Sequence, residues 1–422
     1  MTGIPCDLHG ALRETERCLQ CHDAPCTAAC PVHIDIPGFI RMLRSGNPRG
    51  AAHLIRAANP LAHICGEVCP QEVYCQASCT RGKQDAPVEI RPLHAFASTE
   101  ERRGGYSTPR VPAPGGGRAA VIGGGPAGLA CAFELRRLGR GVVLFEMRDP
   151  GGVPRSSIPS YRLSPEVLEG DLSFLLPHIE VRREEVGADS FRRIRTEYDA
   201  VFVAVGLGAD RPLPLPGADL PGVIPVLRFL EDARSGAGVS RRWENVVVVG
   251  GGNVSLDAAA TAKSLGASHV VLLYRRGESE MKIWKSELEE ARARGVQVAA
   301  LTQPMTVLGT GRVEGVRCLR TRLSGDTGPD GRRLPVAVEG SEHDYPADAV
   351  IAAIGQRPAA EFLQLLETKP EGYVETDGKS ATSLGGVFAG GDVVGREGTI
   401  VRAVAEGRAA AQAMHAFMGK EG

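Results

Sequence analysis

Eight of the eleven cysteines gather near the start of the chain and have the spacing of metal ligands. They form two runs: Cys18, Cys21, Cys26 and Cys30, then Cys65, Cys69, Cys75 and Cys79. Disulfides are rare in cytosolic proteins, whereas thiolates bind iron–sulfur clusters or zinc. The first run ends in Cys-Pro, as many runs that bind 4Fe–4S clusters do, and only Cys18 and Cys21 have the C-x2-C spacing of a zinc hook. Eight thiols therefore favour two 4Fe–4S clusters over zinc.

A glycine-rich turn further along the chain has the pattern that binds the pyrophosphate of a dinucleotide. VIGGGPAGLA supplies Gly123, Gly125 and Gly128 between an apolar strand and a helix. Glycines there permit a tight turn, a close approach of the backbone to phosphate and close packing of the helix on the strand. Glu146 ends the next strand, where a carboxylate binds ribose hydroxyls. An ordinary strand–helix turn is the alternative, but the complete pattern predicts a nucleotide site.

A turn near the end of the chain indicates which nucleotide binds there. GVFAGGDVVG places Gly390, Gly391 and Asp392 after a short strand. It resembles the second FAD fingerprint of flavoproteins that have two dinucleotide-binding domains. That resemblance implies that Asp392 holds the ribityl chain and that the next helix start, near Thr399, faces the flavin. We therefore expect FAD at the first site.

VVVVGGGNVSLDAAATA predicts a second dinucleotide site, although Ser255 replaces the third glycine. The following strand ends in two arginines rather than in an acidic residue. Arginines suit the extra phosphate of NADP, whereas an acid would bind the free ribose hydroxyl of NAD. A solvated basic loop is the alternative reading. The expected coenzyme-binding residues are Gly250, Gly252, Asn253, Arg275, Arg276 and Lys282.

Two copies of one α/β plan must position these sites. After residue 118, apolar strands alternate with helices, which predicts parallel sheets. The second copy is inserted in the first, because the FAD signal resumes after it. We expect two Rossmann-like domains, the NADP domain inserted in the FAD domain, preceded by an α-helical 4Fe–4S ferredoxin-type domain. The predicted limits are 1–97 for the cluster domain, 98–118 for the linker, 119–240 with 356–422 for the FAD domain and 241–355 for the NADP domain.

The composition excludes several other classes of protein. The net charge is −1, which gives no sign of nucleic-acid binding. The polar first residues do not form a signal peptide, and no apolar run approaches the roughly 18–20 residues that span a bilayer. We therefore expect a cytoplasmic protein that binds neither nucleic acid nor membrane.

Disulfide reductases share the plan with two nucleotide sites, but they carry a redox-active cysteine pair. Here Cys131 and Cys318 are solitary in their regions. Electrons therefore need another way out of the flavin, and the cysteine-rich region provides one.

The whole chain resembles the family of dihydropyrimidine dehydrogenase and its separate bacterial flavoprotein subunit. The residues that carry the resemblance are RCLQCHDAPCTAACPVHIDIPGFI, NPLAHICGEVCPQEVYCQASC and DAPVEI. The small subunit of glutamate synthase and the large subunit of NADH-dependent ferredoxin:NADP oxidoreductase are similar. The resemblance also implies that IPSYRLSPEVL, which contains Arg162, lies near the flavin and that YRRGESEM lies at the NADP pocket.

The same resemblance implies how the cluster ligands are shared. One cluster would use Cys18, Cys21, Cys26 and Cys79, and the other would use Cys30, Cys69, Cys75 and one further ligand. His94 stands where the relatives have a glutamine or glutamate ligand, whereas Cys65 matches a cysteine that they do not use. If the eight clustered cysteines simply filled the eight ligand positions, Cys65 would be the last ligand instead. We predict His94.

These features predict an oxidoreductase in which NADPH gives hydride to FAD and single electrons pass through two clusters to a partner. No domain for reducing a final organic substrate is visible, so we expect an electron-transfer subunit of a hetero-oligomer. The leading partner is a dihydropyrimidine dehydrogenase catalytic subunit. A glutamate synthase large subunit or a ferredoxin-like acceptor is the enzymatic alternative. The non-enzymatic alternative is a nucleotide-binding interaction protein stapled by zinc.

Overall fold

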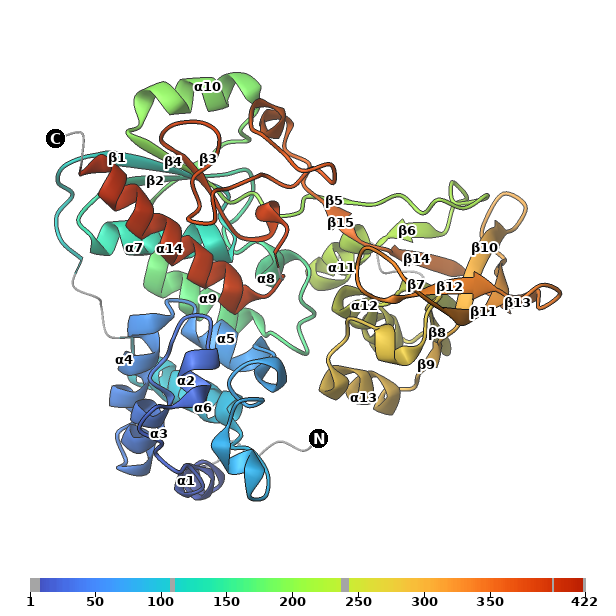
Figure 1. Cartoon of the computed structure of the whole chain (residues 1–422), viewed down its shortest axis with the longest axis horizontal. Helices are drawn as coiled ribbons and strands as arrows, with labels where there is room; N and C mark the ends of the chain where they lie inside the picture. Colours follow the sequence, from blue (N-terminus) through green and yellow to red (C-terminus); the bar gives the residue numbers. More distant parts are fainter. Residues whose placement is uncertain (1–7, 107–110, 237–242, 397, 420–422) are drawn as a thin grey trace. The chain divides into compact units, whose positions relative to one another are not determined.

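The computed structural model describes the chain except for residues 1–7, 107–110, 237–242, 397 and 420–422. Its contacts divide the chain into two compact units (Figure 1). Unit one comprises 1–155, 160–208 and 357–422, and unit two comprises 156–159 and 209–356.

Short helices carry the cysteine-rich region, as the sequence predicts. They are α1 (Leu8–Glu16), α2 (Pro25–Ala29), α3 (Ile36–Arg44), α4 (Pro48–Ala58), α5 (Ala62–Val68) and α6 (Ile90–Gly104), with the 3-10 turns η1 (Gln71–Val73) and η2 (Thr80–Lys83). Asp35 caps α3 by accepting from the Gly38 N–H at 3.0 Å, and Asn47 caps α4 in the same way. Most of the cysteines lie at helix ends or in loops, where different segments of the chain can come close to one another.

A five-stranded parallel sheet forms the rest of unit one, with strand order β16-β4-β1-β2-β3. The strands are β1 (Arg118–Ile122), β2 (Gly141–Glu146), β3 (Glu180–Arg183), β4 (Ala200–Val203) and β16 (Val387–Ala389). The helices are α7 (Pro126–Arg137), α8 (Val153–Ser156), α9 (Pro165–Leu175), α10 (Ala188–Glu197) and α14 (Ile400–Met418), with the 3-10 turns η3 (Leu176–His178), η5 (Glu361–Leu365) and η6 (Asp392–Val394). Helices α7 and α14 lie side by side, and a Cβ at Gly407 of α14 would be only 2.1 Å from the Ala127 carbonyl oxygen of α7 (Figure 1).

Unit two repeats the same sheet plan with the order β6-β14-β7-β8-β9. Its strands are β6 (Val223–Pro225), β7 (Asn245–Gly250), β8 (His269–Leu273), β9 (Val296–Ala299) and β14 (Ala349–Ala353), and its helices are α11 (Val226–Ser235), α12 (Asn253–Ser264) and α13 (Lys285–Ala293). An antiparallel sheet is attached, formed by β10 (Thr302–Leu308), β11 (Gly315–Thr327), β12 (Arg333–Ala337) and β13 (His343–Pro346). The predicted fold class is confirmed. The predicted domain limits stay a prediction; β6 pairs with β14, so 209–236 group with unit two by their contacts.

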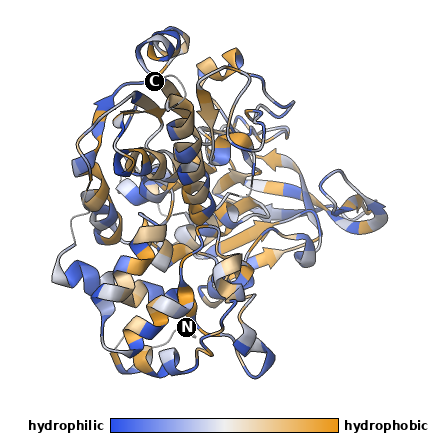
Figure 2. Cartoon of the chain, turned by 60° about the vertical axis from the view of Figure 1, so that its left-hand side comes forward, coloured by the Kyte–Doolittle hydropathy of each residue, from blue (hydrophilic) through white to orange (hydrophobic). Residues whose placement is uncertain are grey.

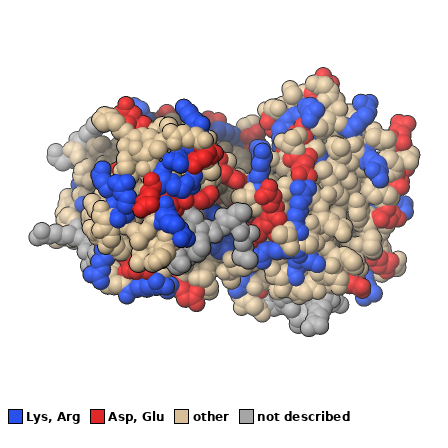
Figure 3. Space-filling model, turned by 90° about the horizontal axis from the view of Figure 1, so that it is seen from below, with Lys and Arg blue, Asp and Glu red and all other residues tan. Residues whose placement is uncertain are grey.

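Apolar residues concentrate in the strands of both sheets (Figure 2). Positive and negative side chains are interspersed over the face that Figure 3 shows. Within the part of the chain that the structure describes, no helix combines the length and the apolar character that crossing a membrane requires.

A buried ionic network joins the helices of the cysteine-rich region to α9. Arg56 of α4 donates to Glu101 of α6 at 2.5 Å and to Asp171 of α9 at 2.9 Å. The other oxygen of Asp171 accepts from the Ile64 backbone N–H of α5 at 2.9 Å. The Arg56 guanidinium also lies 4.4 Å from the centre of the Phe174 ring, a cation–π contact. The three charged side chains of this network therefore have partners of opposite charge, as burial demands.

Candidate functional site

The first glycine-rich turn lies between β1 and α7. Gly123 has φ of +105°, and a Cβ there would be 2.5 Å from the Ala204 carbonyl oxygen. A Cβ at Gly128 would be 1.8 Å from the Gly123 carbonyl oxygen, so helix and strand approach closely only because this residue is glycine. Gly125 begins α7, and the space beside it is open, with only the Gly152 Cα within 4 Å of an added Cβ. The helix start thus leaves a cradle that fits a pyrophosphate.

Glu146 is held against this turn. Its Oε2 accepts from the Gly124 N–H at 2.6 Å and its Oε1 accepts from the Arg148 N–H at 2.8 Å. Two backbone donors fix the carboxylate at the end of β2 and leave lone pairs on the same oxygens for further donors. That is the position from which an acidic residue binds ribose hydroxyls.

The FAD fingerprint near the end of the chain, which contains Gly391 and Asp392, lies beside the first glycine-rich turn. A Cβ at Gly391 would lie 2.9 Å from the Ala127 Cβ at the start of α7. Burial raises the pKa of Asp392 to about 6, and the neighbouring Glu406 carboxylate adds to the rise. Thr399 caps α14 by accepting from the Arg402 N–H. Arg162 is half-buried in the same unit. Two signals more than 260 residues apart in the chain therefore form one site that fits FAD.

The thiols of Cys18, Cys21, Cys26 and Cys79 line one small cavity. Burial raises the pKa of the Cys26 thiol to about 11, and the nearby Cys79 and Cys18 contribute to that rise. Cys79 therefore joins the first cysteine run in space, although it ends the second run in the sequence. Four thiols around one cavity are the donor set of a 4Fe–4S cluster.

The remaining cysteines form a second, more deeply buried group. Burial raises the pKa of the Cys69 thiol, and the neighbouring Cys65, Cys75 and Cys30 add to the rise. In this group only Cys69 is partly exposed, whereas all four thiols of the first group are. In the described part of the chain, no three or more Cys, His, Asp or Glu side chains are grouped so as to hold one metal ion.

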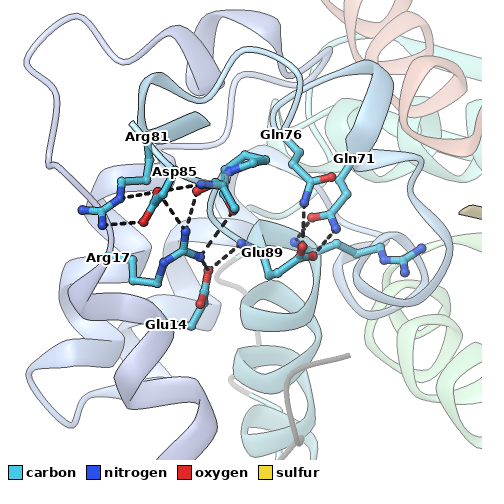
Figure 4. Close-up of polar contacts among 10 residues, drawn as sticks. Glu14, Arg17, Gln71, Gln76, Arg81, Asp85 and Glu89 are labelled. Carbon is cyan, nitrogen blue, oxygen red and sulfur yellow. Dashed lines mark hydrogen bonds and ion pairs between the residues drawn. The ribbon is translucent and has the colours of Figure 1, made fainter. Parts of the chain in front are cut away.

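Polar contacts hold the loops that carry these cysteines (Figure 4). Glu89, just before α6, accepts from Gln71 at 2.7 Å and from Gln76 at 2.9 Å. The Glu89 N–H in turn donates to Glu14 of α1, which also accepts from Arg17 at 2.6 Å. The loop on either side of Cys75 is thus tied to both α1 and α6 by side chains from separate elements.

The third glycine turn borders a pocket of about 570 Å³ in unit two. All six predicted coenzyme residues line it: Gly250, Gly252, Asn253, Arg275, Arg276 and Lys282. Ser255, in place of the third glycine, donates its hydroxyl to the Gly252 carbonyl and accepts from the Gly252 N–H. A small polar residue therefore closes the turn without blocking the pocket.

A family model described as pyridine nucleotide-disulphide oxidoreductase matches residues 117–407. The chain belongs to this family. A second model, described as dihydropyrimidine dehydrogenase domain II, 4Fe-4S cluster, matches residues 4–106. This member of the family is therefore an NAD(P)H-dependent flavin oxidoreductase with a 4Fe–4S domain in its first hundred residues. The resemblance drawn from the sequence is confirmed.

Three curated relatives are similar over nearly the whole chain. The glutamate synthase (NADPH) small chain of Escherichia coli is 36% identical, over 95% of this chain and 90% of the relative. NAD-dependent dihydropyrimidine dehydrogenase subunit PreT of Escherichia coli is 33% identical, over 97% and 94%. NADP(+)-dependent formate dehydrogenase subunit beta of Moorella thermoacetica is 36% identical over 94% of this chain, which spans only 60% of that protein.

Among solved structures, Mycobacterium tuberculosis FprA in complex with NADPH has a TM-score of 0.60. The two proteins are 21% identical, and the match covers 72% of this chain and 85% of FprA. This likeness concerns the fold alone, and it agrees with the two-sheet plan of the oxidoreductase.

The two arginines that follow β8 differ in their surroundings. Arg276 is buried; its Nε donates to the Arg333 carbonyl at 2.9 Å and its Nη2 lies 3.3 Å from Asp330. Arg275 is exposed, and within the described residues it has no ion-pair partner. The Arg276 guanidinium therefore fastens the β11–β12 hairpin, whereas that of Arg275 is available to a ligand.

Arg332 also lines the pocket, and sequence reasoning missed it. It lies beside the β11–β12 hairpin turn and donates to the Tyr274 hydroxyl at 2.9 Å across 58 residues of sequence. No local motif marks it, because a distant hairpin brings it to the rim.

His94 has the hydrogen bonding of a metal-binding histidine. It is buried on α6, and burial lowers its pKa to about 3, so the ring is neutral. One ring nitrogen bonds the backbone of Ala62, while Nε2 is buried without a partner among the described residues. A backbone bond at one nitrogen leaves the other as a lone-pair donor. Cys65 stays the rival, because it is buried next to Cys30 and Cys69.

We propose His94 as the eighth ligand, which predicts a difference between two variants. Cys65→Ser should keep both clusters, whereas His94→Ala should lose or alter the second, because its loss leaves a cluster iron without its protein ligand. Iron assays and EPR of the reduced, anaerobically isolated proteins measure this. A Cys65→Ser protein that loses a cluster, beside a His94→Ala protein with both signals unchanged, would reverse the assignment.

Proposed function

We propose that this oxidoreductase oxidises NADPH with bound FAD and delivers the electrons, through two 4Fe–4S clusters, to a partner subunit. The observation that carries the proposal is that both cysteine groups and both FAD fingerprints lie within one compact unit. FAD supplies the step from a two-electron donor to one-electron acceptors. The protein supplies the placement, and no acid–base pair is required.

The residues divide into three sets. FAD would be held by Gly123, Gly125, Gly128, Glu146, Arg162, Gly391, Asp392 and Thr399. One cluster would be held by Cys18, Cys21, Cys26 and Cys79, and the other by Cys30, Cys69, Cys75 and His94. The first set of thiols is partly exposed, which suits a surface where a partner docks, and the second is more deeply buried.

The choice of coenzyme rests on the pocket, because the names of relatives of similar identity include both NAD and NADPH. Arg275 and Lys282 both line the pocket and are both exposed at its rim. Among the described residues that line the pocket, none is an Asp or Glu at the end of β8, where NAD-specific sites have an acidic residue. Two free cations favour a coenzyme with an additional phosphate, hence NADPH.

Arg275→Ala should therefore weaken NADPH binding about tenfold or more and leave NADH binding nearly unchanged. A charge-assisted phosphate contact contributes roughly 1.5–3 kcal/mol, which corresponds to this factor. Anaerobic titration of the flavin absorbance with each coenzyme gives both affinities. Arg294→Ala, which removes a partly exposed arginine paired with Glu290 of α13, is the control. Equal kinetics with NADPH and NADH in the unmutated protein would contradict the preference.

The leading partner is a dihydropyrimidine dehydrogenase catalytic subunit in a cytoplasmic hetero-oligomer. Support comes from the match of the first hundred residues to the dihydropyrimidine dehydrogenase model and from the similarity to PreT, whose name marks it as a subunit. A glutamate synthase large subunit or a ferredoxin-like acceptor is the alternative, because the glutamate synthase small chain is equally similar. Anaerobic purification with the co-purifying partner distinguishes them.

A brown protein with flavin bands that NADPH bleaches supports the function, and a colourless zinc protein rejects it.

A further inference from the structure

A hydrogen bond joins the loop of the second cysteine group to the last helix of the chain. The Tyr74 hydroxyl lies 2.9 Å from the Thr399 hydroxyl, across 325 residues of sequence. Both residues are 7% exposed. A buried hydroxyl pair is costly to separate, because each partner would lose its bond away from water.

On the cysteine side, Tyr74 directly precedes Cys75. Its backbone N–H donates to the Gln71 carbonyl at 3.1 Å, and the Gln76 N–H donates to the same carbonyl at 2.9 Å. The Gln71 and Gln76 side chains are in turn held by Glu89. The loop is therefore stiff, and a constraint on the Tyr74 ring is passed to the Cys75 thiol.

On the FAD side, Thr399 is the residue that caps α14. A Cβ at Gly398 would lie 3.6 Å from Asp392 Oδ1, so the start of α14 borders the fingerprint aspartate. The Tyr74–Thr399 hydrogen bond thus connects a cluster loop with the turn that we assign to FAD.

We propose that Tyr74 is a positioning residue that fixes the second cysteine group against the FAD site. Its hydroxyl holds the Cys75 loop and the N-terminus of α14 at a constant separation. Electron transfer between the flavin and the second cluster depends on that separation. The electron-transfer part rests on the proposed function, whereas the mechanical link between the loop and the helix does not.

Tyr74→Phe tests the proposal, because it removes the hydroxyl and keeps the ring. In the anaerobic holoprotein, reduction of the flavin by NADPH should keep its rate. The following reduction of the clusters, read from absorbance and EPR, should slow by roughly fivefold, the population change that one lost buried hydrogen bond produces. Amide hydrogen exchange in the oxidised protein should rise at 69–79 and at 398–402.

Three further variants separate positioning from general damage. Tyr198→Phe removes a buried hydroxyl that has no partner among the described residues, and it should change neither the cluster rate nor the exchange. Thr399→Ser keeps a hydroxyl and should retain most of the rate. Thr399→Val combined with Tyr74→Phe should be no slower than the slower single variant, because both changes remove the same Tyr74–Thr399 bond and only Thr399→Val also removes the cap of α14.

Unchanged cluster reduction and unchanged exchange in Tyr74→Phe would overturn the proposal. Failure of NADPH to reduce the unmutated protein would instead refute the proposed function. In that case, hydrogen exchange at 69–79 and 398–402 still decides whether the link exists.

Discussion

Asp171→Ala is expected to destabilise the protein by about 3–5 kcal/mol, because it leaves the buried Arg56 with one of its two charge partners missing. It also removes the acceptor of the Ile64 N–H at the interface between α5 and α9. The helices of the cysteine-rich region should therefore lose their hold on the FAD sheet. Urea denaturation of the holoprotein, followed by circular dichroism and by flavin fluorescence, gives the change in unfolding free energy.

The matched control for Asp171 is an exposed ion pair on a helix of the same interface. Glu100 of α6 lies 2.7 Å from Arg103, whose side chain is 69% exposed. Glu100→Ala should cost less than about 1 kcal/mol, because solvent screens such pairs. Asp171→Asn should fall between the two, since the amide oxygen can still accept from the Ile64 N–H. If Asp171→Ala cost no more than Glu100→Ala, the network would not hold the interface.

Cys79→Ser should remove the same cluster as Cys18→Ser, and not the cluster that Cys75→Ser removes. The reason is that Cys79 lines the same cavity as Cys18, Cys21 and Cys26, although in the sequence it is the last cysteine of the second run. Each variant should lower iron from about eight to about four atoms per chain, because each 4Fe–4S cluster loses a thiolate ligand. Iron and acid-labile sulfide assays give the number, and EPR of the reduced protein identifies the signal that is lost.

Cys318→Ser provides the control for these cysteine variants. Cys318 is buried in β11 of unit two, whereas both cysteine groups belong to unit one, so its replacement should keep all the iron. A loss shared by Cys79→Ser and Cys75→Ser, but absent from Cys18→Ser, would restore the grouping by sequence runs. Stoichiometric zinc in the unmutated protein would exclude both groupings.

The parts of the site that the sequence predicts are those that depend on local geometry. The turn at Gly123 needs positive φ, and Gly128 needs a missing Cβ, so residue types alone mark the strand–turn–helix unit. The fold class follows from the alternation of strands and helices and from its repetition. The six predicted pocket residues of unit two follow for a similar reason, because they lie at the turn between β7 and α12 or in the loop after β8.

The remaining features depend on contacts between distant parts of the chain. Arg276 reads as a phosphate ligand in the sequence, but its guanidinium bonds the hairpin backbone at Arg333. Arg332 and the Tyr74–Thr399 bond have no motif, since each needs a partner that the fold brings from far away. Spacing likewise could not assign Cys79 to the first group; only the resemblance to relatives did.

Unit one is built from segments that precede and follow unit two in the sequence, and this order affects how the protein is synthesised. Strand β16 completes the first sheet, and Gly391, Asp392 and Thr399 follow it, all after the whole of unit two has been translated. At roughly 5–20 residues per second, a ribosome needs on the order of 20–60 s to proceed from Tyr74 to Thr399. Until then the nascent chain has only part of the site that we assign to FAD, and its cysteine loop lacks helix α14, to which it is hydrogen-bonded. We therefore expect flavin loading to follow translation, and a chain that ends before β16 should not retain the flavin.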